Sequence, residues 1–210
     1  VIVITGAAGF IGWNLYLKLK ERGERLLLVD YVSKFNGEFT PDADIMDPDQ
    51  FISQLYDRNF VSQIKAVLHQ GACSDTMEKD VAYMMRQNFD YSHYLLIACM
   101  RHKIPLIYAS SAAVYGHGPY IEEPEDLVPS EQPLNIYAKS KQVFDQYANV
   151  YIPYTAETQI VGLRYFNVYG PWEHRKGKMS SVIHQFDQQI KNSGEVQIFK
   201  GSNEFYRDFI

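Results

Sequence analysis

The first twelve residues constrain the fold most strongly, because they place an apolar run, a glycine-rich turn and a helical pattern in direct succession. Val1–Thr5 is the apolar run, glycines follow at Gly6, Gly9 and Gly12, and apolar residues at helical spacing occupy 10–22. Glycines in such a turn let the backbone approach a ligand closely, and the first turn of a helix offers free N–H groups to an anion. The segment predicts a binding site for a phosphate or pyrophosphate group.

The rest of the chain alternates short apolar runs with helical patterns. We predict strands at 1–5, 26–30, 43–45, 66–69, 104–109 and 159–164, and helices at 10–22, 50–57, 83–101 and 137–151. This alternation indicates βαβ units and a parallel sheet. Unbroken hydrophobicity in the strands fits a sheet covered on both faces. The predicted fold class is α/β, a doubly wound parallel sheet of the Rossmann type with helices on both faces.

The pattern changes in two places. Residues 117–133 are rich in Pro, Glu and Gly, which predicts a surface loop. Past 171 the periodicity loosens, and 207–210 look like a strand that is cut short. We expect residues 1–166 to form a dinucleotide-binding domain and 167–210 to begin a smaller substrate-binding region that continues beyond the sequence given.

Composition excludes several classes of function. The net charge of −5, without a basic run, argues against nucleic acid as a partner. Apolar stretches such as Tyr94–Met100 are too short to span a membrane. The chain opens on a strand with no charged leader, and Cys73 and Cys99 suit free thiols, so we expect a cytoplasmic protein. The six histidines lack metal-binding spacing, so no metal is expected.

Asp30 closes the second predicted strand. An acidic residue about 20 positions beyond the glycine turn normally binds the ribose hydroxyls of an adenine dinucleotide. Its carboxylate favours NAD, because it would repel the 2′-phosphate of NADP. Lys34 lies just beyond and could pair with that phosphate, so these residues leave NAD and NADP open.

Tyr137 and Lys141 lie four residues apart on a predicted helix and therefore share one face. Ser111 follows the fifth predicted strand, and active sites of open α/β sheets lie at the carboxyl ends of strands. Lowering the pKa of a phenol from near 10 to near 7 takes about 4 kcal/mol. A cation about 5 Å away supplies roughly 3 kcal/mol of this, so Lys141 and the oxidised nicotinamide ring together could supply the whole. The three residues predict that Tyr137 removes the proton of a substrate hydroxyl, with Lys141 stabilising the phenolate and Ser111 binding the substrate oxygen.

These motifs together resemble the extended short-chain dehydrogenase/reductases, and among them the sugar-nucleotide epimerases. The likeness extends over nearly the whole chain, and its more specific marks are His69–Ser74, Tyr83–Met85, Tyr108–Ala113, Arg164–Pro171, Lys176 with Gly177, and 201–209. The resemblance implies bound NADP, with NAD as the alternative, and a substrate such as ADP-heptose or a similar nucleotide sugar. It also implies a role in lipopolysaccharide synthesis and assembly into a homo-oligomer.

The implied reaction oxidises the heptose at C6″ to a ketone, which turns in the site and is reduced again on its other face. Two acid/base residues are expected, and Tyr137 and Lys176 match them. The resemblance implies cofactor contacts, besides the three glycines, from Phe10, Ile11, Asp30, Tyr31, Lys34, Gln70, Gly71, Ala72, Cys73, Ser74, Gln87, Asn88, Lys141 and Val168. It implies substrate contacts from Ser111, Asn167, Lys178, Gln185, Phe199, Lys200, Gly201, Ser202 and Arg207.

Some positions depart from the family pattern, and three rival functions need weighing. Gln70 replaces a usual Glu, and Lys178 and Gln185 stand where Ser and His are expected. A 4,6-dehydratase needs an acidic pair directly after Ser111, where this chain has Ala112 and Ala113. A UDP-hexose 4-epimerase stays open. A non-catalytic NADP-binding regulator is disfavoured, because such proteins commonly lose the catalytic tyrosine.

Overall fold

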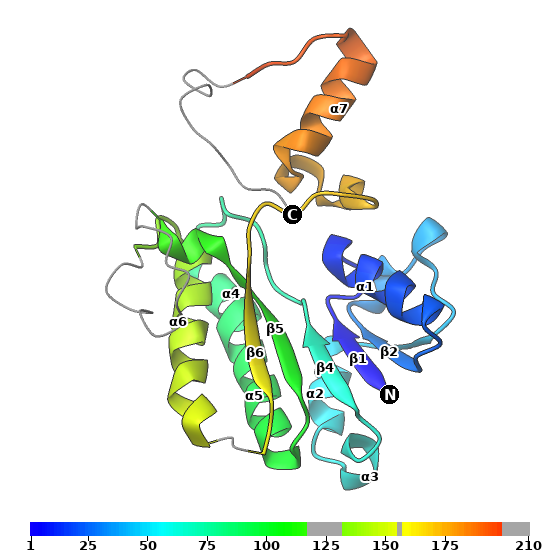
Figure 1. Ribbon diagram of the computed structural model, residues 1–210, viewed down its shortest axis with the longest axis vertical. Coiled ribbons are helices and arrows are strands. Elements are labelled where there is room, and N and C mark those ends of the chain that lie inside the picture. The colour runs from blue at the N-terminus through cyan, green and yellow to red at the C-terminus, as the bar shows by residue number, and fades with distance from the viewer. Residues whose placement is uncertain (117–131, 155–156, 199–210) are drawn as a thin grey trace.

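The computed structural model describes residues 1–116, 132–154 and 157–198. In it, six parallel strands form one sheet in the order β3-β2-β1-β4-β5-β6 (Figure 1). Their bounds are β1 (Ile2–Thr5), β2 (Leu26–Val29), β3 (Asp44–Met46), β4 (Ala66–His69), β5 (Leu106–Ser111) and β6 (Ile160–Tyr165). All six predicted strands are present, and the predicted α/β class is confirmed. The strand order reverses between β1 and β4, where open α/β sheets bind their ligands.

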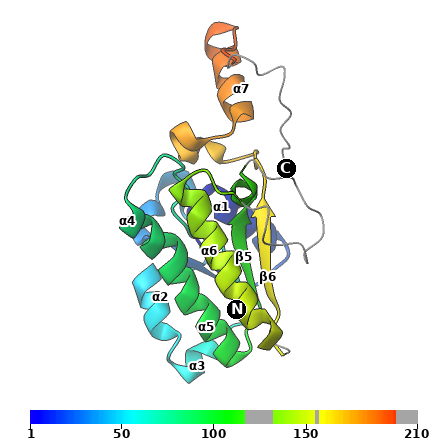
Figure 2. The same cartoon turned by 90° about the vertical axis from the view of Figure 1, so that its left-hand side faces the viewer.

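Helices pack on both faces of the sheet (Figures 1 and 2). Alternate residues of β1 show the two layers: Ile2 and Ile4 join the apolar cluster that contains Trp13 of α1, whereas Val3 joins the larger cluster on the opposite face. That larger cluster draws side chains from α2, α3, α5 and α6. The strands are apolar on both faces for this reason, as the sequence predicted.

Two helices lie close to their predicted positions, α1 (Phe10–Glu21) and α6 (Ile136–Tyr151). The predicted helix at 50–57 is instead two shorter ones, α2 (Pro48–Gln54) and α3 (Arg58–Val61), because Asp57 caps a new helix with its carboxylate. The predicted helix at 83–101 is longer than expected and consists of α4 (Val81–Met85), a π-helical turn at Arg86–Asp90, and α5 (Tyr91–His102).

The sequence pattern did not predict α7 (Val182–Ser193), which stands beyond the carboxyl ends of the strands (Figure 1). It was not predicted although Val182, Phe186 and Ile190 recur at helical spacing along it, and none of its side chains is buried. A 3₁₀-helical segment at Glu173–Met179 leads into it, and other 3₁₀ turns occur at Val32–Lys34, Gly37–Phe39, Ala112–Tyr115 and Ile152–Tyr154. Most of the predicted loop at 117–133, and the predicted strand at 207–210, lie outside the described residues.

Candidate active site

The glycine turn between β1 and α1 is shaped by close backbone packing. Gly6 has φ +66°, and a Cβ there would lie 2.6 Å from the backbone nitrogen of Gly71. A Cβ on Gly12 would lie 2.2 Å from the carbonyl oxygen of Gly6. Helix α1 begins at Phe10, and no side chain caps it at Gly9. Its first N–H groups therefore remain available to an anion at the edge of the sheet.

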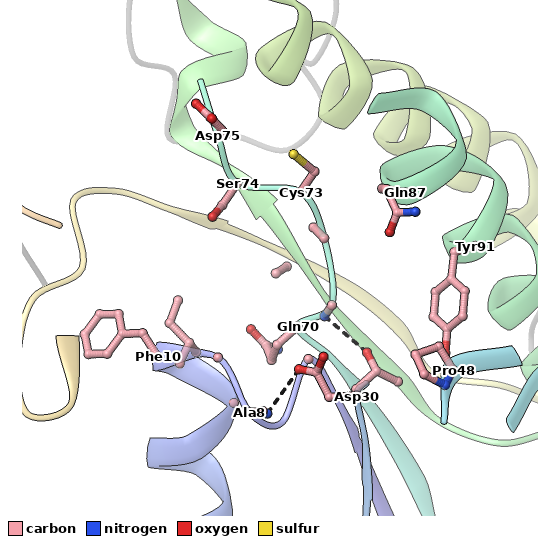
Figure 3. A pocket seen from close by; sticks show the side chains of 18 of the residues that line it. Ala8, Phe10, Asp30, Pro48, Gln70, Cys73, Ser74, Asp75, Gln87 and Tyr91 are labelled. Atoms are coloured by element: carbon pink, nitrogen blue, oxygen red, sulfur yellow. Dashed lines mark hydrogen bonds between the residues drawn. The ribbon is translucent and has the colours of Figure 1, made fainter. Parts of the chain in front are cut away.

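Asp30 lies beside this turn, at the end of β2 (Figure 3). It is only 6% exposed, and its carboxylate accepts hydrogen bonds from the backbone N–H of Ala8 at 3.1 Å and of Tyr31 at 2.9 Å. Lys34 reaches back to it, with 3.0 Å between Nζ and Oδ1. The acidic group is thus fixed in place, and half of the Lys34 side chain stays exposed beside it.

A cleft of about 1470 Å³ extends from this turn along the carboxyl ends of the strands. It has the size for a dinucleotide together with a second ligand, since pockets for drug-sized molecules hold about 300–1,000 Å³. The predicted site residues that line it are Gly6, Gly9, Phe10, Ile11, Gly12, Asp30, Tyr31, Lys34, Gln70, Gly71, Ala72, Cys73, Ser74, Gln87, Ser111, Tyr137, Lys141, Asn167, Val168 and Lys176.

Two buried polar atoms in the cleft have no hydrogen-bond partner among the described residues. They are the side-chain oxygen of Gln70 and the hydroxyl of Tyr91, which lies next to Pro48 in Figure 3. Unpaired buried polar atoms cost free energy, and a polar ligand in the cleft would satisfy them. Together with the turn at α1 and the fixed carboxylate of Asp30, they fit a bound dinucleotide.

Asn88 lies behind the cleft and does not line it. It is 1% exposed, and its amide holds the backbone of Cys73 by two hydrogen bonds, one to N–H at 2.7 Å and one to the carbonyl at 3.0 Å. The amide also donates to the hydroxyl of Ser140 at 2.9 Å. The π-helical turn turns Asn88 inward. Asn88 therefore joins the loop after β4 to helix α6.

Ser111, Tyr137 and Lys141 come together as expected. Ser111 ends β5. Helix α6 begins after Asn135, whose side chain caps it by accepting a hydrogen bond from the N–H of Ala138 at 2.8 Å. Tyr137 in the first turn and Lys141 in the second both face the cleft. A hydrogen bond joins the hydroxyls of Ser111 and Tyr137.

The groups of the protein alone do not lower the pKa of Tyr137. Burial raises the pKa of Tyr137, although the hydrogen bond from Ser111 offsets part of the effect, and Lys141 is not among the groups that shift it. The ammonium of Lys141 donates instead to the carbonyl of Ala109 at 2.9 Å. Desolvation of the buried phenol outweighs the attraction of the ammonium. Burial also lowers the pKa of Lys141 to about 8, while Asp145 and Cys73 raise it.

Asp145, which the sequence reasoning did not single out, lies one helical turn beyond Lys141. Its carboxylate is buried and accepts hydrogen bonds from Ser110 at 2.7 Å, Arg164 at 3.1 Å and Tyr108 at 3.2 Å. It thereby joins α6 to both β5 and β6. The position of Asp145, four residues after Lys141, was a signal available in the sequence. The partners of Asp145 on β5 and β6 could not be predicted from it.

Lys176 enters the same cleft from the segment between β6 and α7. Its Nζ lies 5.7 Å from the ring centre of Phe10, at the start of α1. Burial lowers its pKa, and Glu173 partly opposes this effect. The neighbouring Arg175 also lines the cleft, and no sequence pattern had marked it.

Two predicted substrate contacts are not brought into the cleft. Lys178 is exposed, and Gln185 uses its side-chain amide to donate to the carbonyl of Ser180 at 2.8 Å at the start of α7. Phe199, Lys200, Gly201, Ser202 and Arg207 lie outside the described residues. Within 1–116, 132–154 and 157–198, no three side chains of the metal-binding types gather as a candidate metal site, and no helix is long and apolar enough to cross a membrane.

Comparison with known proteins places this cleft in context. Residues 2–210 match the NAD dependent epimerase/dehydratase family. A protein of Alkalilimnicola ehrlichii named ADP-L-glycero-D-manno-heptose-6-epimerase is 45% identical, and the alignment covers all of this chain and 68% of that protein.

Solved structures give the same picture. ADP-L-glycero-D-manno-heptose-6-epimerase of Helicobacter pylori superposes with a TM-score of 0.79 at 28% identity, covering all of this chain and 68% of that one. UDP-glucose 4-epimerase of Thermotoga maritima, solved with UDP-glucose, superposes with a TM-score of 0.82 at 26% identity over the same shares. The UDP-glucose 4-epimerase of Thermus thermophilus, solved with NAD, has a TM-score of 0.71 at 28% identity, covering 90% of this chain and 62% of that one. The chain therefore belongs to the NAD dependent epimerase/dehydratase family.

Proposed function

We propose that this protein is an epimerase that interconverts ADP-D-glycero-D-manno-heptose and ADP-L-glycero-D-manno-heptose. The observation that carries the proposal is the presence of two separate acid/base groups in one cleft. Tyr137 comes from α6 and Lys176 from the segment after β6, and both line the cleft beside the glycine turn. Oxidation of a carbinol and reduction of the resulting ketone on its opposite face require a proton acceptor and a proton donor at two positions. A simple dehydrogenase needs one.

The residues divide the chemistry as follows. A nicotinamide cofactor held by the glycine turn and Asp30 would supply reversible hydride transfer at the sugar carbon. Tyr137 takes the hydroxyl proton, and Ser111 binds the substrate oxygen as its charge changes. Lys176 supplies the acid/base group for the other face. Its lowered pKa suits it for proton transfer nearer neutral pH than an exposed lysine.

The heptose nucleotide is favoured over UDP-hexoses by the 45% identity, over the whole of this chain and 68% of the relative, to a protein named for ADP-heptose. NADP is favoured as the cofactor because Lys34 offsets the carboxylate of Asp30 at the point where a 2′-phosphate would lie. The division at residue 166, the cytoplasmic location, the homo-oligomer and the role in lipopolysaccharide synthesis belong to the same proposal. Gln87 and Val168 line the cleft and are proposed as cofactor contacts.

A direct substrate comparison tests the proposal. We expect the purified protein, saturated with NADP or with NAD, to equilibrate the two ADP-heptose epimers and to leave UDP-galactose unchanged. Product analysis by chromatography and NMR distinguishes the two. Lys176→Met should reduce kcat about 100-fold, the lower range for loss of a general acid/base. Lys178→Met, two residues away and exposed, is the matched control. Conversion of UDP-galactose in preference to ADP-heptose would favour a UDP-hexose 4-epimerase instead.

The pH dependence of turnover should reveal the effect of Asp145 on the pKa of Lys141. The ammonium of Lys141, with a pKa of about 8, is charged below that value and lost above it, so activity should decline on the alkaline side. The carboxylate of Asp145 raises this pKa, and Asp145→Asn should therefore move the alkaline limb of kcat to lower pH. The same change removes the ion partner of Arg164 and should cost about 3 kcal/mol of stability.

Ser110→Ala is the control for this pH shift, because it removes one hydrogen bond to Asp145 without changing any charge. Its pH profile should match that of the unchanged protein. An Asp145→Asn profile that keeps its alkaline limb in place would show that Lys141 does not set it.

A further inference from the structure

The segment between β6 and α7 carries Lys176. Arg175, the residue before Lys176, attaches this segment to the dinucleotide side of the cleft. One terminal nitrogen of the guanidinium donates to the carbonyl of Ala8 at 3.1 Å, and the other donates to the carbonyl of Lys34 at 2.8 Å. Ala8 belongs to the glycine turn, and Lys34 belongs to the 3₁₀ turn after Asp30. The guanidinium also stacks on Phe39, with 3.9 Å from Cζ to the ring centre. A single side chain therefore joins two loops that line the cleft to the buried ring of Phe39.

Neighbouring residues fix the same segment in place. Asn14 of α1 donates to the carbonyl of Pro171 at 2.9 Å. The ring of Trp172 lies 5.4 Å from that of Phe39 and 6.4 Å from that of Trp13, measured between ring centres. Trp172 has φ +70°, a conformation that a bulky residue adopts only when its surroundings hold it there. In Figure 1 the segment, drawn in gold, lies over the first turns of α1.

The same segment is also bound to the start of α7. The carboxylate of Glu173 is 1% exposed and accepts hydrogen bonds from the backbone and the hydroxyl of Ser181, at the start of α7. Glu173 therefore binds the segment to the start of α7, whereas Arg175 binds it to the loops that follow β1 and β2. Lys176 follows Arg175 directly, so the position of its ammonium over Phe10 depends on where the guanidinium is held.

We propose that Arg175 is a positioning residue that places Lys176 over the cleft by joining its segment to the two cofactor loops. The inference rests on the proposed function, which assigns Lys176 as the second acid/base group. Both partners of the guanidinium are main-chain carbonyls, and only the planar fork of arginine can bind both at once. The arrangement makes the second acid/base group depend on the correct shape of the glycine turn and of the turn after Asp30.

Arg175→Gln tests the proposal in the full chain. We expect kcat for ADP-heptose to fall about 10- to 100-fold, the range for a displaced catalytic group, while KM and the Kd for NADP change less than about threefold. Arg175→Lys, which keeps the charge but reaches only one carbonyl, should fall between Arg175→Gln and the unchanged protein. His174→Gln is the matched control, since it removes the adjacent ion pair with Glu38 and leaves the fork intact.

Tryptophan fluorescence gives a readout that does not need activity. The two tryptophans of the chain, Trp13 and Trp172, meet at this contact, and Trp13 is 2% exposed. Acrylamide should therefore quench Trp172 more strongly in Arg175→Gln than in Lys178→Met, whose exposed side chain lies on the same segment. Unchanged quenching would overturn the proposal. A loss of kcat that saturating NADP restores would also overturn it, because Arg175 would then be a cofactor ligand. Increased quenching in a protein that does not turn over ADP-heptose would contradict the proposed function and leave the role of Arg175 in holding the segment standing.

Discussion

Tyr137→Phe is expected to reduce kcat about 1,000-fold, within the range for removal of a general base. The substitution keeps the ring that packs at the start of α6 and removes only the hydroxyl that is hydrogen-bonded to Ser111. The Kd for the cofactor, measured by fluorescence titration, should stay within about threefold, because the glycine turn and Asp30 are not altered. A large loss of kcat with unchanged cofactor binding would identify the phenol as the group that moves the proton.

The matched control for this experiment lies on the same helix. Tyr147 is ten residues further along α6, and its hydroxyl contacts that of Tyr151 at 3.3 Å, away from the cleft. Tyr147→Phe should leave kcat unchanged. If Tyr137→Phe keeps more than about a tenth of the activity, well above the loss expected for a general base, another group takes the hydroxyl proton. A pure NADP-binding regulator would show no turnover in any of these proteins.

Gly6→Ala is expected to lower cofactor affinity at least 100-fold and to destabilise the fold. The left-handed backbone of Gly6 alone costs an alanine about 1–2 kcal/mol. In addition the new Cβ would lie 2.6 Å from the nitrogen of Gly71 and 2.7 Å from the carbonyl carbon of Gln70. Both are backbone atoms that cannot rotate away. The loops after β1 and β4 must therefore move apart at the point where the pyrophosphate is expected to lie.

Gly23→Ala separates the two effects. Gly23 ends α1 with φ +72°, close to the value of Gly6, but a Cβ there meets no atom within 4 Å. It should cost the same backbone strain, about 1–2 kcal/mol in thermal or denaturant unfolding, and leave the Kd for NADP unchanged. Isothermal calorimetry measures both affinities. Equal Kd values for the two variants would mean that the spacing between the loops does not shape the cofactor site.

The sequence was sufficient for the parts of the protein that depend on local physics. A strand buried on both faces reads as an unbroken apolar run, and β1 and β2 were predicted from such runs. The edge strand β3 includes Asp44 and is largely exposed, yet it was predicted within one residue. The glycine turn, Asp30 and the pairing of Tyr137 with Lys141 also follow from spacing alone. The helix α7 was missed although Val182, Phe186 and Ile190 recur at helical spacing, because the pattern beyond 171 was interpreted as loose.

The charge states could not be predicted in the same way. The groups of the protein alone do not lower the pKa of Tyr137, because burial raises it and the ammonium of Lys141 donates to the carbonyl of Ala109. Asn88 was expected at the cofactor, but the π-helical turn directs it to the backbone of Cys73. Neither the burial nor the turn leaves a pattern in the neighbouring residues.

By itself, then, the sequence determined the sheet, the phosphate-binding turn and the types of residue available for acid/base chemistry, because each of these is specified by residues close together in the chain. Tertiary structure alone decided which of these groups meet. Arg175 reaches Ala8 and Lys34 across more than 130 positions of the chain, and Asp145 joins two strands to α6. Contacts of this kind form when separate elements pack against one another, and no local spacing encodes them.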